Sequence, residues 1–398
     1  MSQRILPVVL LSHFTAALVA LGMPPFFGLI LTDAFAMDDP AWVGWFFILP
    51  TVCTAVAAPF WGKVADRFGR RWSLIRAQLG LAAAFVLAGL APNLTTFAAA
   101  LILQGILGGT FAASSAYLAT VTRGQALAQA LNWMQGSARS AMLLAPILIG
   151  ALITRIPAQS LYLWLAILPL LSALQVWTFA PPDQTQAEER ARKPQNNSDT
   201  VSVRWQRLAL LQFGFNFSLV AGFPYFIPWV QSLTGSTTAV AGLLYSLPHA
   251  VYLAILASPL RRSQLFQSPS ALTAGLALFA LSYVIQATTD SMAVILIGRI
   301  SMGLGMTACF FALNGETARL TRSENAGKSF GALDSIGKWA GVAGGVFAGV
   351  ATGMSDQAAP LWLGAVVCLL TLTVSGSRNH PPATSNHECL EKEESRCR

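Results

Sequence analysis

The sequence predicts an all-α integral membrane protein of twelve transmembrane helices, arranged as two six-helix repeats. Apolar residues make up 54% of the 398-residue chain and charged residues only 11%, whereas about a quarter of a soluble domain is charged. The apolar residues gather in stretches of about 20, the length that crosses a bilayer as a helix. The second half of the chain also repeats features of the first, as expected for two structural repeats.

Twelve apolar stretches follow one another along the chain, six on each side of a polar break. The break at residues 181–207 is rich in Gln, Asn, Arg and Pro, so we expect a cytoplasmic linker between one bundle at 1–180 and another at 208–377. The charged residues 378–398 predict a disordered cytoplasmic tail. The predicted spans are 7–31, 42–62, 73–91, 97–120, 129–153, 160–180, 208–231, 239–260, 269–287, 291–314, 329–351 and 358–376.

The positive residues predict the orientation in the membrane. Loops between twelve spans alternate between two sides, and nearly all loop Lys and Arg residues fall on one side. Because cytoplasmic loops carry the excess of Lys and Arg, we expect a multi-pass protein of the inner (cytoplasmic) membrane with both termini in the cytoplasm. The net charge is +8, but because the positive residues fall in alternate loops and not on one face, the charge argues against nucleic acid as a partner. The other side receives Arg155, Asp33, Asp38, Asp39, Asp290 and Asp356.

Several residues recur in the second half at a nearly constant offset. Gly22 and Pro24 recur 200 residues later as Gly222 and Pro224. Each match is weak alone, but a constant offset along most of a half supports two parallel repeats. Further pairs are Phe26 with Phe226, Gly44 with Gly242, Leu49 with Leu247, Pro50 with Pro248, Gly105 with Gly303, Arg123 with Arg322, and Arg139 with Lys338.

The segment Gly62–Arg71 joins the second and third spans and is dense in charge. Its glycines permit a tight turn, and Asp66 can accept hydrogen bonds from a helix N-terminus or pair with an arginine. A basic loop can also be a topology anchor and nothing more. The order G-x-x-x-D-R-x-G-R-R nevertheless resembles the loop between the second and third helices of the major facilitator superfamily of secondary transporters. The resemblance implies a twelve-helix transporter whose halves are latched in one state by Gly62, Asp66, Arg67, Gly69, Arg70 and Arg71.

Four charged residues stand out inside the predicted spans, where a charge costs at least a few kcal/mol unless it has a partner, a cavity or a function. Arg139, Arg299 and Lys338 lie near the bilayer midplane, and Asp334 lies one helical turn before Lys338. The resemblance implies that all four line the central cavity. Asp334 and Lys338 can neutralise each other, but the two arginines then stay unpaired, which favours an anionic substrate. Polar and aromatic residues that can complete a substrate pocket are Gln135, Asn216 and Tyr245.

Proton coupling needs a titratable group that reaches water and changes its environment during transport. Asp334 is the best carboxylate for this role, against the alternative of a structural pair with Lys338. His13 in the first span and His249 in the eighth are further candidates. A lone histidine in an apolar helix is, however, more often a hydrogen-bonded structural residue.

Two partial family elements bear on proton transfer and on the direction of transport, respectively. Gln104-Gly105 is present in the fourth span, but Leu101 stands where the family carries an arginine. In the fifth span, Pro146 and Gly150 loosely resemble the Gly-Pro element of antiporters. We therefore expect a proton-coupled efflux transporter for a small organic anion, such as a carboxylate-type siderophore, that works by alternating access. The alternatives are a multidrug/proton antiporter for lipophilic compounds, a carboxylate uptake symporter and, in a different class, a transport-dead sensor or scaffold.

The sequence carries no arrangement typical of catalysis. No nucleophile, metal-ligand set or catalytic dyad has the required spacing, and the five cysteines form neither a disulfide framework nor a zinc motif. We therefore expect a transporter and not an enzyme, with no cofactor and no metal. Its expected partners are an anionic small molecule, protons and the lipid bilayer, with the chain as a monomer.

Overall fold

The computed structural model describes residues 2–37, 40–181, 198–223, 225–268 and 270–376, which form helices joined by short turns, with no strand among them. The helices of the first half are α1 (Ser2–Gly22), α2 (Phe27–Phe35), α3 (Pro40–Phe68), α4 (Arg70–Gly89), α5 (Leu94–Leu107), α6 (Thr110–Val121), α7 (Gly124–Ile153) and α8 (Leu161–Phe179). Those of the second half are α10 (Ser198–Gly222), α11 (Phe226–Thr234), α12 (Thr238–Ala257), α13 (Gln264–Gln267), α14 (Ala271–Ala287), α15 (Met292–Leu320), α16 (Ala326–Met354) and α17 (Ala359–Gly376).

These helices make the twelve spans that the sequence predicts. Eight spans are long and apolar enough to cross a membrane, and α10 with α11, bent by 41°, makes a ninth. Helices α14 and α17 are apolar but shorter. The remaining span, α16, is less apolar because it carries Lys328, Asp334 and Lys338 among many glycines. A span with this composition needs protein around it, and α16 packs against α3, α10 and α17.

Three spans that the sequence predicts as continuous are interrupted. A 3-10 turn at Pro24–Phe26 separates α1 from α2. The second repeat has its equivalent break after Gly222, where α10 ends before α11 begins. The fourth span divides at Gly108–Gly109, where Gly109 has a φ of 77°. Hydropathy does not reveal such breaks, because the chain stays apolar across them. Proline, which lacks an N–H, and glycine, which tolerates positive φ, make them possible.

The segment Gly62–Arg71 is a sharp helix junction and not the ten-residue loop that the sequence suggests. Helix α3 continues to Phe68 and α4 begins at Arg70, so Gly69 alone makes the turn, with a φ of 106°. A φ of this sign is open to glycine and costly for other residues. The turn therefore holds the charged residues on two rigid helix ends.

The predicted linker is shorter than expected, because α10 already begins at Ser198. Residues 182–197 of this linker and the predicted tail 378–398 lie outside the described residues.

The internal repeat is visible in the packing of equivalent glycines. A Cβ atom on Gly105 would lie 2.4 Å from the Cβ of Cys53, and one on Gly303 would lie 2.6 Å from the Cβ of Val251. Both pairs are separated in sequence by the same number of residues, and each brings a late helix of its half (α5, α15) against an early one (α3, α12). Small residues let transmembrane backbones approach closely, so the two halves use the same packing device.

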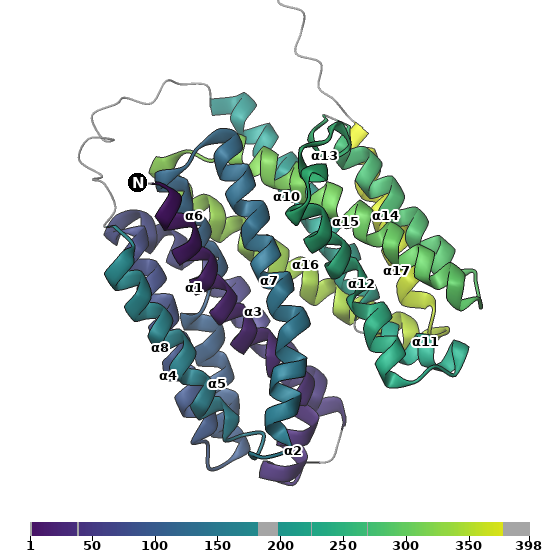
Figure 1. Ribbon diagram of the computed structural model, residues 1–398, viewed down its shortest axis with the longest axis horizontal. Coiled ribbons are helices and arrows are strands. Elements are labelled where there is room, and N and C mark those ends of the chain that lie inside the picture. Colours follow the sequence, from purple (N-terminus) through teal and green to yellow (C-terminus); the bar gives the residue numbers. More distant parts are fainter. Residues whose placement is uncertain (1, 38–39, 182–197, 224, 269, 377–398) are drawn as a thin grey trace, which may run out of the picture.

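The two halves lie side by side and contact each other along a limited set of helices (Figure 1). Helix α16 packs on α3 and α6, and α7 packs on α12 and α15. Helices α2 and α11 lie at one end of the molecule and are well separated in this view. Each half has its own apolar core. A third core at the other end includes Ala318, Ala326 and Phe330 of the second half with residues of the first, so the halves are joined at that end.

Candidate functional site

Asp66 of α3 caps the N-terminus of α16 in the other half. Its Oδ1 accepts a hydrogen bond from the backbone N–H of Gly327 at 2.8 Å, and its Oδ2 accepts one from Lys328 at 2.7 Å. The first N–H groups of a helix lack partners within the helix and carry the positive end of its dipole, so a carboxylate satisfies both demands. We name the end of the bundle that holds Asp66, Lys328 and Arg123 the basic end.

Arg70 and Ser323 extend this contact between the halves. Arg70 donates to Asp66 Oδ1 through Nη2 at 2.9 Å and through Nε at 3.2 Å. Its Nη2 also donates to the backbone carbonyl of Ser323 in the second half. Arg123 of the first half donates from Nε to Ser323 Oγ at 3.1 Å, and this hydroxyl donates to the carbonyl of Ala119 at 3.2 Å. The turn before α16 is therefore held to the first half by several polar contacts.

Four small residues bring α3 and α16 into backbone contact beside this network. A Cβ atom on Gly62 would lie 2.2 Å from the carbonyl oxygen of Gly327, and one on Gly331 would lie 2.5 Å from that of Ala58. Carbonyl oxygens cannot yield at such distances without a shift of the whole helix. The spacing of four residues on both helices is the small-xxx-small pattern of closely packed membrane helices.

Two of the predicted latch arginines make contacts within the first half. Arg71 donates a hydrogen bond to the backbone carbonyl of Trp177 in α8. Arg67 is exposed, and its guanidinium lies 5.2 Å from the ring centre of Phe68.

Arg139 of α7 lies between the two halves and is surrounded by residues of the second. It is 4% exposed, and its guanidinium carbon lies 4.2 Å from the ring centre of Phe310 and 4.8 Å from that of Tyr252. Its Nη1 donates to Gln135 Oε1 at 2.9 Å. Cation–π contacts of this kind stabilise a cation but do not neutralise its charge. Across the described chain, no carboxylate lies within ion-pair distance of Arg139.

A set of hydrogen bonds next to Arg139 also joins the halves, and we name Asn132, Tyr252 and Asn314 the floor. Tyr252 Oη donates to the backbone carbonyl of Asn132, and Asn314 Nδ2 donates to Asn132 Oδ1, both at 2.8 Å. Asn132 and Asn314 are buried at 6% and 7% exposure. Sequence reasoning missed all three residues. The signal available was an asparagine inside each of two apolar spans, because amides in membrane helices commonly bond across helices.

Lys338 and Asp334 lie on one helix but do not form the self-neutralising ion pair that the sequence allows. The ion pairs found among the described residues, at a limit of 4.0 Å, do not include them. Asp334 is 8% exposed, and its Oδ2 is buried with no hydrogen-bond partner among the residues that the structure describes, whereas Lys338 is half-buried. Lys338 interacts electrostatically with Asp334 and also with His13 of the other half. His13 Nδ1 in turn lies 2.7 Å from Ser137 Oγ.

Arg299 lies inside the second half and serves its local structure. Its side chain is fully buried, Nε donates to the carbonyl of Leu244 at 2.9 Å, and Nη2 donates to that of Tyr245 at 2.6 Å. The reason lies four residues after Leu244, where Pro248 has no N–H to offer the Leu244 carbonyl. Arg299 replaces this missing donor, and its guanidinium stacks 4.0 Å from the ring centre of Phe226. This position favours a structural role over substrate contact.

The remaining predicted site residues lie on two helices of the second half: Tyr245 and the proton-coupling candidate His249 on α12, and Asn216 on α10. His249 is 3% exposed and stacks on Phe223 at 5.1 Å between ring centres, and neither of its ring nitrogens has a hydrogen-bond partner in the described part of the chain. Tyr245 packs against the same Phe223 ring at 5.2 Å. Asn216 is half-buried on α10 and faces Gly337 of α16, so it lies beside the helix that carries Asp334.

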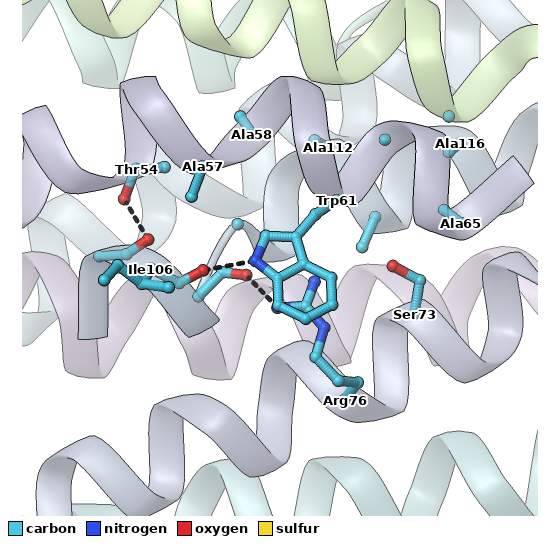
Figure 2. A pocket seen from close by; sticks show the side chains of 16 residues that line it. Thr54, Ala57, Ala58, Trp61, Ala65, Ser73, Arg76, Ile106, Ala112 and Ala116 are labelled. Atoms are coloured by element: carbon cyan, nitrogen blue, oxygen red, sulfur yellow. Dashed lines mark hydrogen bonds between the residues drawn. The ribbon is translucent and has the colours of Figure 1, made fainter. Parts of the chain in front are cut away.

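A narrow crevice in the first half lies where the fourth span is broken (Figure 2). Trp61 Nε1 donates to the carbonyl of Ile106 at 2.6 Å, and Arg76 Nη1 donates to that of Leu107. The Arg76 guanidinium stacks 3.6 Å from the Trp61 ring centre. Both side chains thus satisfy carbonyls at the C-terminus of α5, where the helix dipole is negative. Sequence reasoning missed Arg76, which stands six residues into α4 and so inside a span.

Comparison with known proteins identifies relatives for most of the chain. The model of the Major Facilitator Superfamily matches residues 9–266. The class C tetracycline resistance protein of Escherichia coli is 27% identical over 90% of this chain and 91% of its own length. The staphyloferrin B transporter of Staphylococcus aureus is 28% identical over 40% of this chain and 39% of its own length. The multidrug resistance protein MdtG of Yersinia enterocolitica is 37% identical over 28% of this chain and 27% of its own. The chain therefore spans less than half of the last two relatives and nearly all of the first.

Two solved structures share the fold. The human organic anion transporter MFSD10 (TETRAN) superimposes with a TM-score of 0.80 at 19% identity, over 94% of this chain and 99% of the other. The transporter FucP, in its outward conformation, gives a TM-score of 0.71 at 16% identity, over 94% and 98% of the two chains. At such identities the likeness establishes the fold, and it confirms the twelve-helix prediction.

Proposed function

The chain belongs to the Major Facilitator Superfamily, and from this membership we propose that it exports a small organic anion, such as a carboxylate-type siderophore, by proton-coupled alternating access. The family was predicted from the Gly62–Arg71 motif and is confirmed. The chain is accordingly a multi-pass membrane transporter of small molecules and not an enzyme. We propose, beyond this, the class of substrate, the coupling to protons and the orientation in the membrane.

The proposal of an anionic substrate rests mainly on one observation. Arg139 and Lys338 are two cations at membrane depth near the contact between the halves, and neither has an ion-pair partner within 4.0 Å among the described residues. An unpaired charge at this depth is costly unless it serves a ligand. Among the relatives, one is named for a siderophore and one solved neighbour for organic anions, which agrees with an anion here.

The contacts at the basic end support an outward-facing state. The positive-inside rule places this end in the cytoplasm. There the halves are joined by the Asp66 cap of α16 and by the floor, while α2 and α11 lie apart at the opposite end (Figure 1). We assign the predicted latch role to Gly62, Asp66 and Arg70, with Gly69 as the turn that sets their geometry. Release of this end would open the transporter to the cytoplasm.

The charges around Lys338 determine whether the anion and the proton move in the same direction or in opposite directions. An anion beside Lys338 is favoured when Asp334 is protonated and repelled when it is charged, so anion and proton bind together and move in the same direction. This differs from the antiport that the sequence suggests. Export is still downhill: a trianion leaving with one proton gains about 4.6 kcal/mol per 100 mV of interior-negative potential, against about 1.4 kcal/mol for one unit of opposing pH gradient.

A second candidate, drug/proton antiport, is favoured by the match to the tetracycline resistance protein along nearly its whole length. For a cationic drug the coupling has the opposite sign, because cation and proton compete for Asp334. The test uses purified protein in liposomes with a trapped pH-sensitive dye. An outward citrate gradient that carries protons out of the liposomes supports anion export. Inward proton movement driven by the efflux of a lipophilic cation, with no response to citrate, supports the drug antiporter and excludes the anion proposal.

A further inference from the structure

The guanidinium of Arg139 keeps one edge without a strong hydrogen-bond partner. Nη1, at the other edge, donates to Gln135 Oε1 at 2.9 Å. Nε is buried and has no partner within the described chain. Nη2, on the same edge as Nε, contacts Met306 Sδ at 3.9 Å, and a thioether sulfur is a weak acceptor. A buried donor without a partner is unfavourable, so this arrangement needs an explanation.

We propose that the Nε–Nη2 edge of Arg139 is a subsite for one carboxylate of the transported anion, and that Met306 is the side chain that this carboxylate displaces. The proposal rests on the proposed function and assigns its binding geometry. A carboxylate docks side-on to such an edge with two parallel charge-assisted bonds, which a single ammonium cannot reproduce. Met306 is unbranched and flexible, so it can fill the edge when empty and move aside when a ligand arrives.

The same displacement would loosen the contact between the halves. Met306 lies one helical turn before Phe310 on α15, and the Phe310 ring is one of the two on which Arg139 stacks. The other ring belongs to Tyr252, whose hydroxyl bonds to the backbone of Asn132 in the floor. A carboxylate that draws the guanidinium off these rings therefore removes one support of the floor. Anion binding and opening of the basic end are coupled through Arg139.

Hydrogen exchange of the full-length protein, with citrate as the probe, tests this coupling. In the wild type, citrate is expected to raise amide exchange in peptides that cover the starts of α7 and α16. Arg139→Lys keeps the charge but lacks the paired donors, so the citrate concentration for half of this response should rise at least about tenfold. Met306→Glu places a carboxylate at the edge permanently and should show raised exchange without citrate. Met306→Leu keeps an apolar side chain but loses the flexibility of the thioether, so it should show no raised exchange without citrate and should need more citrate than the wild type for the response.

Two outcomes overturn the inference. One is an Arg139→Lys variant that responds at wild-type citrate concentrations, and the other is a Met306→Glu variant indistinguishable from Met306→Leu. If Met306→Glu does not fold, the Arg139→Lys comparison decides alone. Citrate transport by the wild type in liposomes separates the proposed function from the proposed subsite. If the wild type transports citrate and either outcome above is observed, the subsite is wrong and the proposed function stands. Absence of both transport and an exchange response in the wild type removes the proposed function and this subsite with it.

Discussion

The carboxylate of Asp66 on α3 accepts the backbone N–H of Gly327, the second residue of α16, at 2.8 Å across the contact between the halves. A transmembrane helix is thus capped by a residue of the other repeat. A cap within one chain segment stabilises that segment, but a cap between the two moving bodies stabilises one arrangement of them. The cap forms where the halves meet, so its energy biases a conformational equilibrium.

Asp66→Asn is expected to shift the protein towards the state open at the basic end. Asparagine keeps one acceptor but loses the charge that strengthens both backbone bonds and the pair with Arg70. A loss of about 1.4 kcal/mol would change the ratio of the two states about tenfold. Spin labels on Gln125→Cys and Gln267→Cys, both exposed at the basic end on opposite halves, would report a longer distance, in a background without the native cysteines. Asp33→Asn, at an exposed residue of α2, is the control and should leave the distance unchanged.

Gly331→Ala is expected to produce the same shift by steric means. The added Cβ would lie 2.5 Å from the carbonyl oxygen of Ala58, so α3 and α16 must separate. Gly345→Ala on the same helix is the matched control, because a Cβ there meets no described atom within 4 Å and alanine otherwise favours the helix. The same pair of spin labels measures the result. Equal distances in the two variants would show that close packing at Gly331 does not hold the halves together.

Arg139→Ala and Lys338→Ala are expected to abolish citrate transport while the protein still inserts and folds. Each variant removes one of the two cations that have no ion-pair partner in the described chain. Unlike Arg299, neither Arg139 nor Lys338 replaces a backbone donor that a proline has removed, so the fold does not depend on them in that way. Citrate flux in liposomes and a thermal melt in detergent are the two measurements. Normal flux in both variants would exclude an anion site built on these cations.

Arg299→Met is expected to lower stability instead. The variant keeps length and apolar bulk but leaves the carbonyl of Leu244 buried without a donor, at a cost of about 2 kcal/mol. The matched comparison is Arg139→Met, which exposes no such carbonyl and should melt close to the wild type. If Arg299→Met melts normally and loses only transport, Arg299 belongs to the substrate site after all.

Arg139 and Arg299 show which features of the site could be predicted from the sequence and which could not. Both lie at similar depth in a span, and hydropathy gives depth along a helix but not the neighbour that a side chain faces. Arg139 faces the other half, whereas Arg299 faces Pro248 of its own half, and a proline far away in sequence cannot be matched to its substitute donor from periodicity alone. The motif around Asp66 was recognisable because its residues are adjacent in the chain. Its acceptor role towards Gly327 depends on a contact between helices that only the fold provides.

Asp334→Asn is expected to separate anion movement from proton movement. Asparagine resembles the protonated carboxyl, so Lys338 keeps its attraction for the anion, but the residue can no longer take up or release a proton. Liposomes that hold labelled citrate and a pH-sensitive dye should therefore lose citrate at a rate close to the wild type, without the proton efflux that accompanies it there. Proton movement that persists with citrate would place the coupling group elsewhere, with His13 and His249 as the next residues to replace. Loss of citrate flux itself would show that the charged form of Asp334 is needed for binding, as a site for a cation requires, and would favour the drug antiporter.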